Sequence, residues 1–134
     1  MVSPVQALQD TFVLGMLLGD PDLCASVYAR NAIFVPPNRE QLYGRREIRD
    51  FWWRVIDQGG RGDAVITEKI ERTSPDQIIE FGQYARFAEP VLLGRPIAKG
   101  GYLVAVERQR NGSWAWAADV WSDLLRVAPA DRIH

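Results

Sequence analysis

The clearest alternation of apolar and polar side chains lies near the end of the chain. Two alternating segments, 101–110 and 114–121, flank Asn111 and Gly112, and that pair is a strong signal for a β-hairpin loop. A two-residue loop there sets Val104 opposite Asp119 on the neighbouring strand. The sequence therefore predicts an antiparallel hairpin with a defined register.

Because successive side chains of a strand point to opposite sides of a sheet, this register assigns each hairpin residue to a face. One face is expected to hold Tyr102, Val104, Val106, Arg108, Ala115, Ala117, Asp119 and Trp121. The other is expected to hold Leu103, Ala105, Glu107, Trp114, Trp116, Ala118 and Val120. Both faces are apolar enough to be covered, and Asp119 is the carboxylate that interrupts the first.

Helical spacing dominates the first part of the chain. Ser3 and Pro4 favour a helix start, apolar residues recur at helical intervals through residues 5–17, and Gly19 favours a helix end. A second, short helix is expected after Asp20, with a buried side of Leu23, Cys24, Val27 and Tyr28. A third is expected from Gly44, with a core-facing stripe of Ile48, Phe51, Trp52, Val55 and Ile56.

Alternating segments between the helices and the hairpin predict further strands. Residues 32–35 form a short strand stopped by two prolines, and 64–72 and 77–87 alternate as longer strands. Within the last, Gly82 indicates a bulge or bend. Ile78, Glu80, Gly82, Tyr84 and Arg86 share one of its faces. The order of elements predicts an α+β fold.

Composition limits the chemistry available. The 134 residues suffice for one domain, and a net charge of −1 gives no electrostatic reason to expect nucleic acid or a membrane surface as partner. Cys24 is the one cysteine and His134, the last residue, the one histidine, so a Ser-His-Asp triad, a Cys-His pair or a histidine-bound metal is not expected. With no secretory or membrane-spanning segment apparent, a cytoplasmic location is expected.

Several segments together resemble a known superfamily. They are 28–37 (YARNAIFVPP), 44–48 (GRREI) with Phe51 and Trp52, 80–84 (EFGQY), 100–104 (GGYLV) and 111–121 (NGSWAWAADVW). This pattern resembles the nuclear-transport-factor-two-like superfamily, and within it the SnoaL-like branch that includes SgcJ/EcaC-type proteins. The resemblance implies an α+β cone, in which a strongly curved antiparallel or mixed sheet wraps around three N-terminal helices and encloses an internal pocket. It covers about residues 5–122, leaving 123–134 as a tail of the single domain 1–134.

The resemblance also guides the choice of site residues. Ketosteroid isomerases of this fold use polar groups at positions that align with Phe12, Pro36 and Val106, so that mechanism has no atoms to act with here. SnoaL-like cyclases place an acid/base carboxylate on the last strand, and Asp119 matches that neighbourhood. Apolar neighbours would raise the pKa of Asp119 towards the range of a general base. The alternative is a structural Asp119, held by Tyr28, an arginine or a backbone N–H.

Two functions of different classes follow. One is a cofactor-independent isomerase, cyclase or dehydratase acting on an apolar carbonyl compound, with Asp119 as acid/base. The other is a non-catalytic ligand-binding or dimerisation module with a structural Asp119; an epoxide hydrolase, which needs an Asp-Arg-Asp set, is the weakest reading. The expected substrate-binding residues are Tyr28, Trp52, Tyr84, Tyr102, Val104, Val106 and Trp121. Arg86 and Arg108 are candidate cations at the pocket mouth, and the alternative is that each pairs with Glu80 or Glu107 on the surface.

The second hairpin face needs a cover that the helices cannot supply. In proteins of this fold the outer sheet face commonly packs against its copy, and two tryptophans in an apolar stripe suit such an interface. A homodimer is therefore expected, with Leu103, Trp114 and Trp116 in its interface. No cofactor and no metal are expected.

Overall fold

The computed structural model describes residues 3–37, 39–88 and 95–122, and the expected tail at 123–134 lies outside them. The helices are α1 (Pro4–Leu18), α2 (Pro21–Ala25) and α3 (Gly44–Asp57). The strands are β1 (Tyr28–Val35), β2 (Leu42–Tyr43), β3 (Gly62–Ser74), β4 (Gln77–Phe87), β5 (Ala98–Arg108) and β6 (Trp114–Ser122).

The expected boundaries of α1 and the expected start of α2 are confirmed by their capping contacts. The Ser3 hydroxyl accepts a hydrogen bond from Gln6 N at 3.1 Å, and Gly19 ends α1 in the left-handed conformation. Asp20 caps α2 by accepting from Leu23 N at 3.1 Å. The expected position of Tyr28 on the second helix is wrong, because Tyr28 begins β1. This strand therefore starts four residues before the expected start at residue 32.

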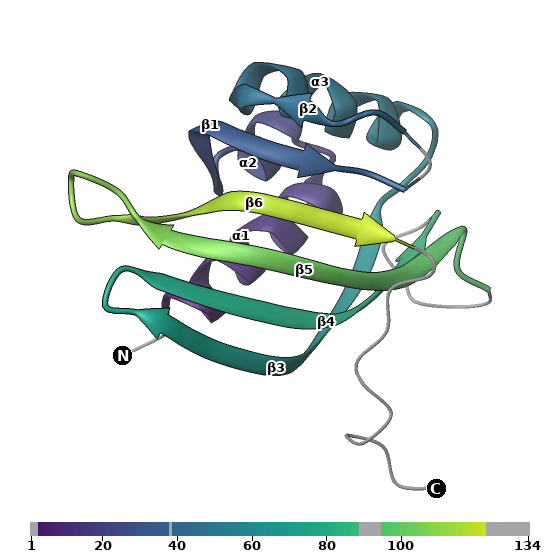
Figure 1. Cartoon of the computed structure of the whole chain (residues 1–134). Coiled ribbons are helices and arrows are strands. Elements are labelled where there is room, and N and C mark those ends of the chain that lie inside the picture. Colours follow the sequence, from purple (N-terminus) through teal and green to yellow (C-terminus); the bar gives the residue numbers. More distant parts are fainter. Residues whose placement is uncertain (1–2, 38, 89–94, 123–134) are drawn as a thin grey trace, which may run out of the picture.

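The strands form one mixed sheet in the order β2-β1-β6-β5-β4-β3, in which only the β1–β6 pair among the described strands is parallel. The described helices lie against one face, and none of them covers the other (Figure 1). The α+β class with three N-terminal helices is thus confirmed. The expected strong curvature is wrong, because the strands twist across the sheet without curling it into a cone (Figure 1).

The β5–β6 hairpin departs from the expected register in one half. Gln109 N donates to Ser113 O at 2.7 Å, so the loop contains three residues and Gly112 takes a positive φ of 87°. This shift pairs Val106 with Trp116. A bulge then leaves Ala117 unpaired, and from Ala105 onwards the pairing is the expected one.

The shifted half of the hairpin places Trp114 and Trp116 on the inner face, so their expected position on the outer face is wrong. Trp116 is 3% exposed and contacts the rings of Phe12 and Tyr28, while Trp114 packs against the edge of the core. Leu103 stays on the outer face, as expected. The pairs Val104–Asp119 and Tyr102–Trp121 also form as expected, because the bulge cancels the extra residue of the loop.

Aromatic side chains fill the space between the helices and the sheet. Trp52 of α3 stacks on Phe34 of β1 with ring centroids 5.5 Å apart, and it meets the edges of Phe12 and Trp121. Trp52 and Phe34 are fully buried. The interior of the described chain, where an internal pocket was expected, is therefore largely filled by aromatic rings.

Candidate functional site

Asp119 lies in the middle of this interior and is fully buried. Tyr28 of β1 donates its hydroxyl hydrogen to Oδ2 at 2.6 Å, and Trp121 Nε1 donates to Oδ1. Tyr28 in turn accepts a hydrogen bond from Trp52 Nε1 at 3.2 Å. Both carboxylate oxygens are thus occupied, and the chain of bonds ties α3 to β1 and β6.

A second buried group is an ion pair. Arg86 of β4 forms two hydrogen bonds to Asp63 of β3, each 3.0 Å long, and its guanidinium lies over the rings of Trp52 and Trp121. The expectation that Arg86 reaches a pocket mouth or pairs with Glu80 is wrong. Its position at the end of the inner face of β4 holds it inside, where stacked rings shield the pair from water.

The expected position of Arg108 at the pocket mouth is also wrong. Its Nε lies 3.0 Å from Oδ1 of Asp76, and its guanidinium lies over the ring of Trp114. Both members of this ion pair are exposed. Arg108 therefore belongs to the molecular surface near the hairpin loop and not to an interior site.

A third buried carboxylate, Glu80, lies on the inner face of β4 and is 1% exposed. Its Oε2 accepts hydrogen bonds from Tyr102 at 2.8 Å and from Thr67 at 3.0 Å. Gln9 of α1 donates to both of these hydroxyls. The other oxygen, Oε1, is buried and has no hydrogen-bond partner among the residues that the structure describes.

Glu80 borders a small cavity between α1 and the sheet. Its lining is Gln9, Phe12, Val65, Glu80, Tyr102, Val104, Trp116 and Trp121. The space measures about 10 Å³, which is roughly the room that one water molecule needs. Trp116 also lines the cavity, and its Nε1 is likewise buried without a hydrogen-bond partner among the described residues. The residues around this apolar space therefore include one unused acceptor and one unused donor.

Burial sets the protonation of these carboxyls. It raises the pKa of Asp119 to about 8, although the hydrogen bonds from Tyr28 and Trp121 act in the opposite direction. It also raises the pKa of Glu80 and of Asp63, and for Asp63 the adjacent Arg86 opposes the rise. These three acids share the described interior with one buried cation, so a neutral form is favoured for some of them.

The structure separates the residues that the sequence grouped into one substrate site. Tyr102, Val104 and Trp121 line the cavity. Tyr28 and Trp52 belong to the Asp119 network, and Val106 is fully buried outside the cavity wall. The ring of Tyr84 lies tilted against that of Trp121, with centroids 4.3 Å apart, and Tyr84 borders a different, surface hollow.

Sequence reasoning overlooked Glu80 as a functional candidate. It interrupts the apolar inner face of β4 in the same way that Asp119 interrupts that of β6, and this was the available signal. Gln9 carried no such signal, because a polar residue within an amphipathic helix usually faces solvent. Asp63 was likewise missed, so Asp119 is one of three buried carboxyls among the described residues.

Neither a metal-binding cluster nor a membrane-spanning helix is found among the described residues. Among residues 3–37, 39–88 and 95–122, no group of three histidine, cysteine, aspartate or glutamate side chains could hold a metal ion. Within the same residues, no helix has the length and apolar character needed to cross a membrane.

Comparisons with known proteins define the class of fold. A domain of unknown function with a cystatin-like fold from Nostoc punctiforme has a TM-score of 0.78 at 15% identity, covering 92% of this chain and 76% of that one. A nuclear-transport-factor-two-like protein of unknown function from Shewanella oneidensis has a TM-score of 0.72 at 17% identity, covering 90% and 97%. A ketosteroid isomerase-like protein from Erwinia carotovora atroseptica scores 0.68 at 16% identity, covering 91% and 95%.

The chain therefore has the nuclear-transport-factor-two-like, or cystatin-like, fold. No protein-family model and no curated protein matches the sequence. At these low identities the likeness concerns the fold alone, so any function has to be argued from the side chains.

Proposed function

We propose that the protein binds a small, mostly apolar molecule between α1 and the sheet, with a polar group of that molecule held by Glu80. The observation that carries the proposal is the buried Oε1 of Glu80, which has no hydrogen-bond partner among the described residues and belongs to a residue that lines the cavity. A buried acceptor without a hydrogen bond costs about 1–3 kcal/mol. A ligand hydroxyl or enol would supply the missing donor and remove that cost.

Binding requires the cavity to widen. Its present size suits one water molecule, and its lining is mainly aromatic and aliphatic. Gln9 of α1 and Val65 of β3 line the cavity from opposite elements. A small separation of α1 from β3 would therefore widen the cavity enough to admit a ring. The side of the site formed by Tyr102, Thr67 and Glu80 is already fixed by hydrogen bonds.

The same carboxyl is the candidate acid/base for an isomerase, cyclase or dehydratase reaction of the SnoaL-like kind. A raised pKa brings Glu80 towards neutral pH, where a carboxyl can both accept and return a proton. Asp119 is a weaker candidate because both of its oxygens are occupied and it does not border the cavity. Its hydrogen bonds favour the structural role.

Binding can be tested with 4-fluorophenol, using fluorobenzene as a ligand of similar shape that lacks the hydroxyl. Fluorine NMR line widths should report binding of 4-fluorophenol to the wild type and about 10-fold weaker binding to Glu80→Gln. Fluorobenzene should bind both proteins equally. Glu71→Gln, the same change at an exposed position of β3, is the control and should behave like wild type. If wild type and Glu80→Gln bind 4-fluorophenol equally, Glu80 does not hold the ligand.

Proton transfer can be tested separately by the exchange of α-hydrogens of cyclohexanone in D₂O. The wild type should accelerate exchange, and the rate enhancement by Glu80→Gln should be at least ~100-fold smaller than that by the wild type. Binding without any exchange would favour the second candidate function, a non-catalytic ligand-binding or dimerisation module. The packed interior and the uncovered outer face of the sheet favour that alternative.

A further inference from the structure

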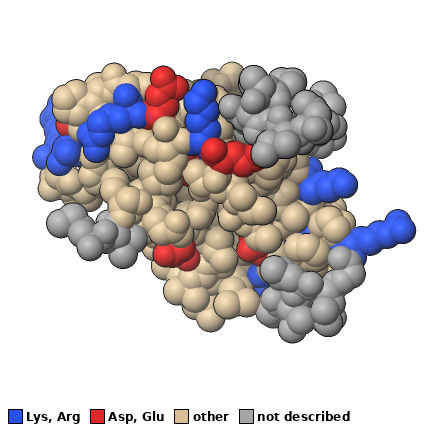
Figure 2. Space-filling model, turned by 90° about the horizontal axis from the view of Figure 1, so that it is seen from below, with Lys and Arg blue, Asp and Glu red and all other residues tan. Residues whose placement is uncertain are grey.

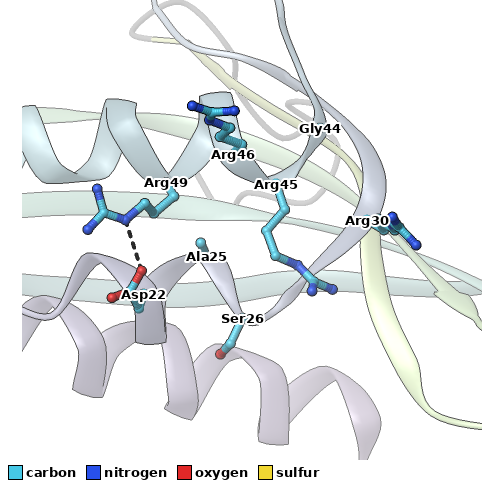
Figure 3. Close-up of a pocket in the computed structure, with 8 residues that line it drawn as sticks. All are labelled: Asp22, Ala25, Ser26, Arg30, Gly44, Arg45, Arg46 and Arg49. Atoms are coloured by element: carbon cyan, nitrogen blue, oxygen red, sulfur yellow. Dashed lines mark hydrogen bonds and ion pairs between the residues drawn. The ribbon is translucent and has the colours of Figure 1, made fainter.

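A surface groove that shares no lining residue with the interior cavity is lined by four arginines. It lies between α2, the first turns of α3 and the start of β1, and it is lined by Asp22, Ala25, Ser26, Arg30, Gly44, Arg45, Arg46 and Arg49 (Figure 3). Its volume of about 790 Å³ falls within the range of about 300–1,000 Å³ that is typical of small-molecule sites.

The charges in the groove do not balance. Arg49 is neutralised by Asp22, with Nε 2.8 Å from Oδ1, and it also approaches Asp50 at 3.4 Å. Arg30, Arg45 and Arg46 form no ion pair with the described carboxylates. Three guanidinium groups thus remain uncompensated in one groove of a chain whose net charge is −1.

Arg45 is held in place for a ligand. Its Nε and Nη2 donate to the backbone carbonyl of Tyr28 at 3.1 and 2.9 Å, which orients the guanidinium without neutralising it. Figure 3 shows Arg45 extending from α3 towards the end of α2, between Arg46 on one side and Arg30 on the other. A cation whose rotamer is fixed loses little entropy when it binds an anion.

We propose that this groove binds a small organic anion through its phosphate or carboxylate groups. Arginine suits both, because its planar fork matches two oxygens of either group. A nucleic-acid strand is less well matched. No described aromatic side chain lines the groove to stack a base. The face of the molecule seen from below in Figure 2 carries basic and acidic side chains interspersed.

The site is independent of the interior cavity, with which it shares no lining residue. A ligand here would contact α3 and β1 from outside. The proposal therefore stands or falls separately from the proposed function of Glu80.

The test is calorimetric titration at ~0.15 M ionic strength, where the Debye length is about 8 Å, with pyrophosphate and, separately, with citrate. The double variant Arg30→Gln with Arg46→Gln should weaken binding at least ~10-fold, because it removes two charge-assisted contacts. The control is Arg54→Gln with Arg110→Gln, which lowers the net charge equally at exposed positions outside the groove. It should change affinity by less than about two-fold, since screening weakens distant charges.

The outcomes are distinct. Binding of pyrophosphate alone assigns a phosphate ligand, binding of citrate alone a carboxylate ligand, and binding of both a general oxyanion site. Absence of saturable binding by either anion overturns the proposal, as does an equal loss of affinity in the two double variants. Binding of a single-stranded oligonucleotide alone would also overturn it. Circular dichroism of each exposed-arginine variant checks that the fold is retained.

Discussion

Asp119 and Glu80 show how two buried carboxyls of one interior differ in what they can do. Asp119 receives a hydrogen bond on each oxygen, from Tyr28 and from Trp121. Glu80 receives both of its hydrogen bonds on Oε2 and leaves the buried Oε1 without a partner among the described residues. The first arrangement holds strands and helix together, whereas the second leaves an atom available to a ligand.

The burial of Asp119 predicts an unusual pH dependence of stability. Its pKa is about 8 in the folded protein and about 3.9 in an unfolded chain. Between these values the folded protein keeps a proton that the unfolded chain releases. The contribution of Asp119 to the free energy of unfolding should therefore fall as the pH rises through this window, by at most about 1.4 kcal/mol per pH unit, and level off above it.

The variant Asp119→Asn isolates this effect, because Glu80 and Asp63 remain in both proteins. Urea unfolding from about pH 5 to about pH 8 should show the wild type losing stability relative to Asp119→Asn, so that the gap between them narrows. Asp57→Asn, at an exposed position, should stay parallel to the wild type. A constant gap between wild type and Asp119→Asn would show that Asp119 has the same pKa in both states.

At the scale of elements, the close approach of β3 and β5 to β4 depends on Gly82. A Cβ added there would lie 2.2 Å from the Ile66 carbonyl oxygen and 2.6 Å from the Tyr102 hydroxyl. Gly82→Ala should therefore displace Tyr102 and lower the free energy of unfolding by at least ~2 kcal/mol in urea unfolding.

The matched control is Gly112→Ala in the hairpin loop. A Cβ at this position meets no atom within 4 Å, but the positive φ of 87° disfavours any residue except glycine. The expected loss is only about 1–2 kcal/mol. Equal losses in the two variants, or a stable Gly82→Ala, would contradict the steric role of Gly82.

The elements themselves followed from local signals, whereas the register of the last hairpin did not. Capping residues such as Ser3 and Asp20 act over a few neighbours, so they identified the helix starts correctly. The Asn-Gly pair suits both two-residue and three-residue loops. The bulge at Ala117 arises from packing of Trp116 against Phe12 and Tyr28, which are distant in sequence.

The candidate site was predictable only in part for the same reason. Asp119 was assigned correctly to the inner face because the bulge compensates for the longer loop. Which inner carboxyl keeps an unused oxygen depends on the hydrogen bonds that Glu80 accepts from Thr67 of β3 and Tyr102 of β5, and a strand pattern contains no information about them. The filling of the interior by Trp52 and Phe34 depends on the same long-range packing.

At the scale of the whole molecule, one side of the sheet is left uncovered by the described helices (Figure 1). Cross-strand pairs on this outer face bring together Phe81 and Leu103, Leu103 and Val120, and Ile79 and Ala105. These rows cross three strands and continue through Ile33 and Val35 of β1, which pair with Ala118 and Val120. We propose that a second copy of the chain covers this face, since a continuous apolar surface favours association.

The dimer is tested best by one substitution made at two places. Leu103→Glu puts a charge at the centre of the outer face, where pairing with a second copy would bury it without a partner, so this variant should be monomeric. Leu18→Glu makes the same change at an exposed position of α1, 63% accessible, and should leave the dimer intact. Light scattering after size exclusion measures both masses.

Trp116→Glu, which the expected register would place at the interface, should instead unfold the protein, because the Trp116 side chain is in the core. A wild-type protein that is monomeric at all concentrations, or a Leu103→Glu variant of unchanged dimeric mass, would show that another partner or no partner covers the sheet.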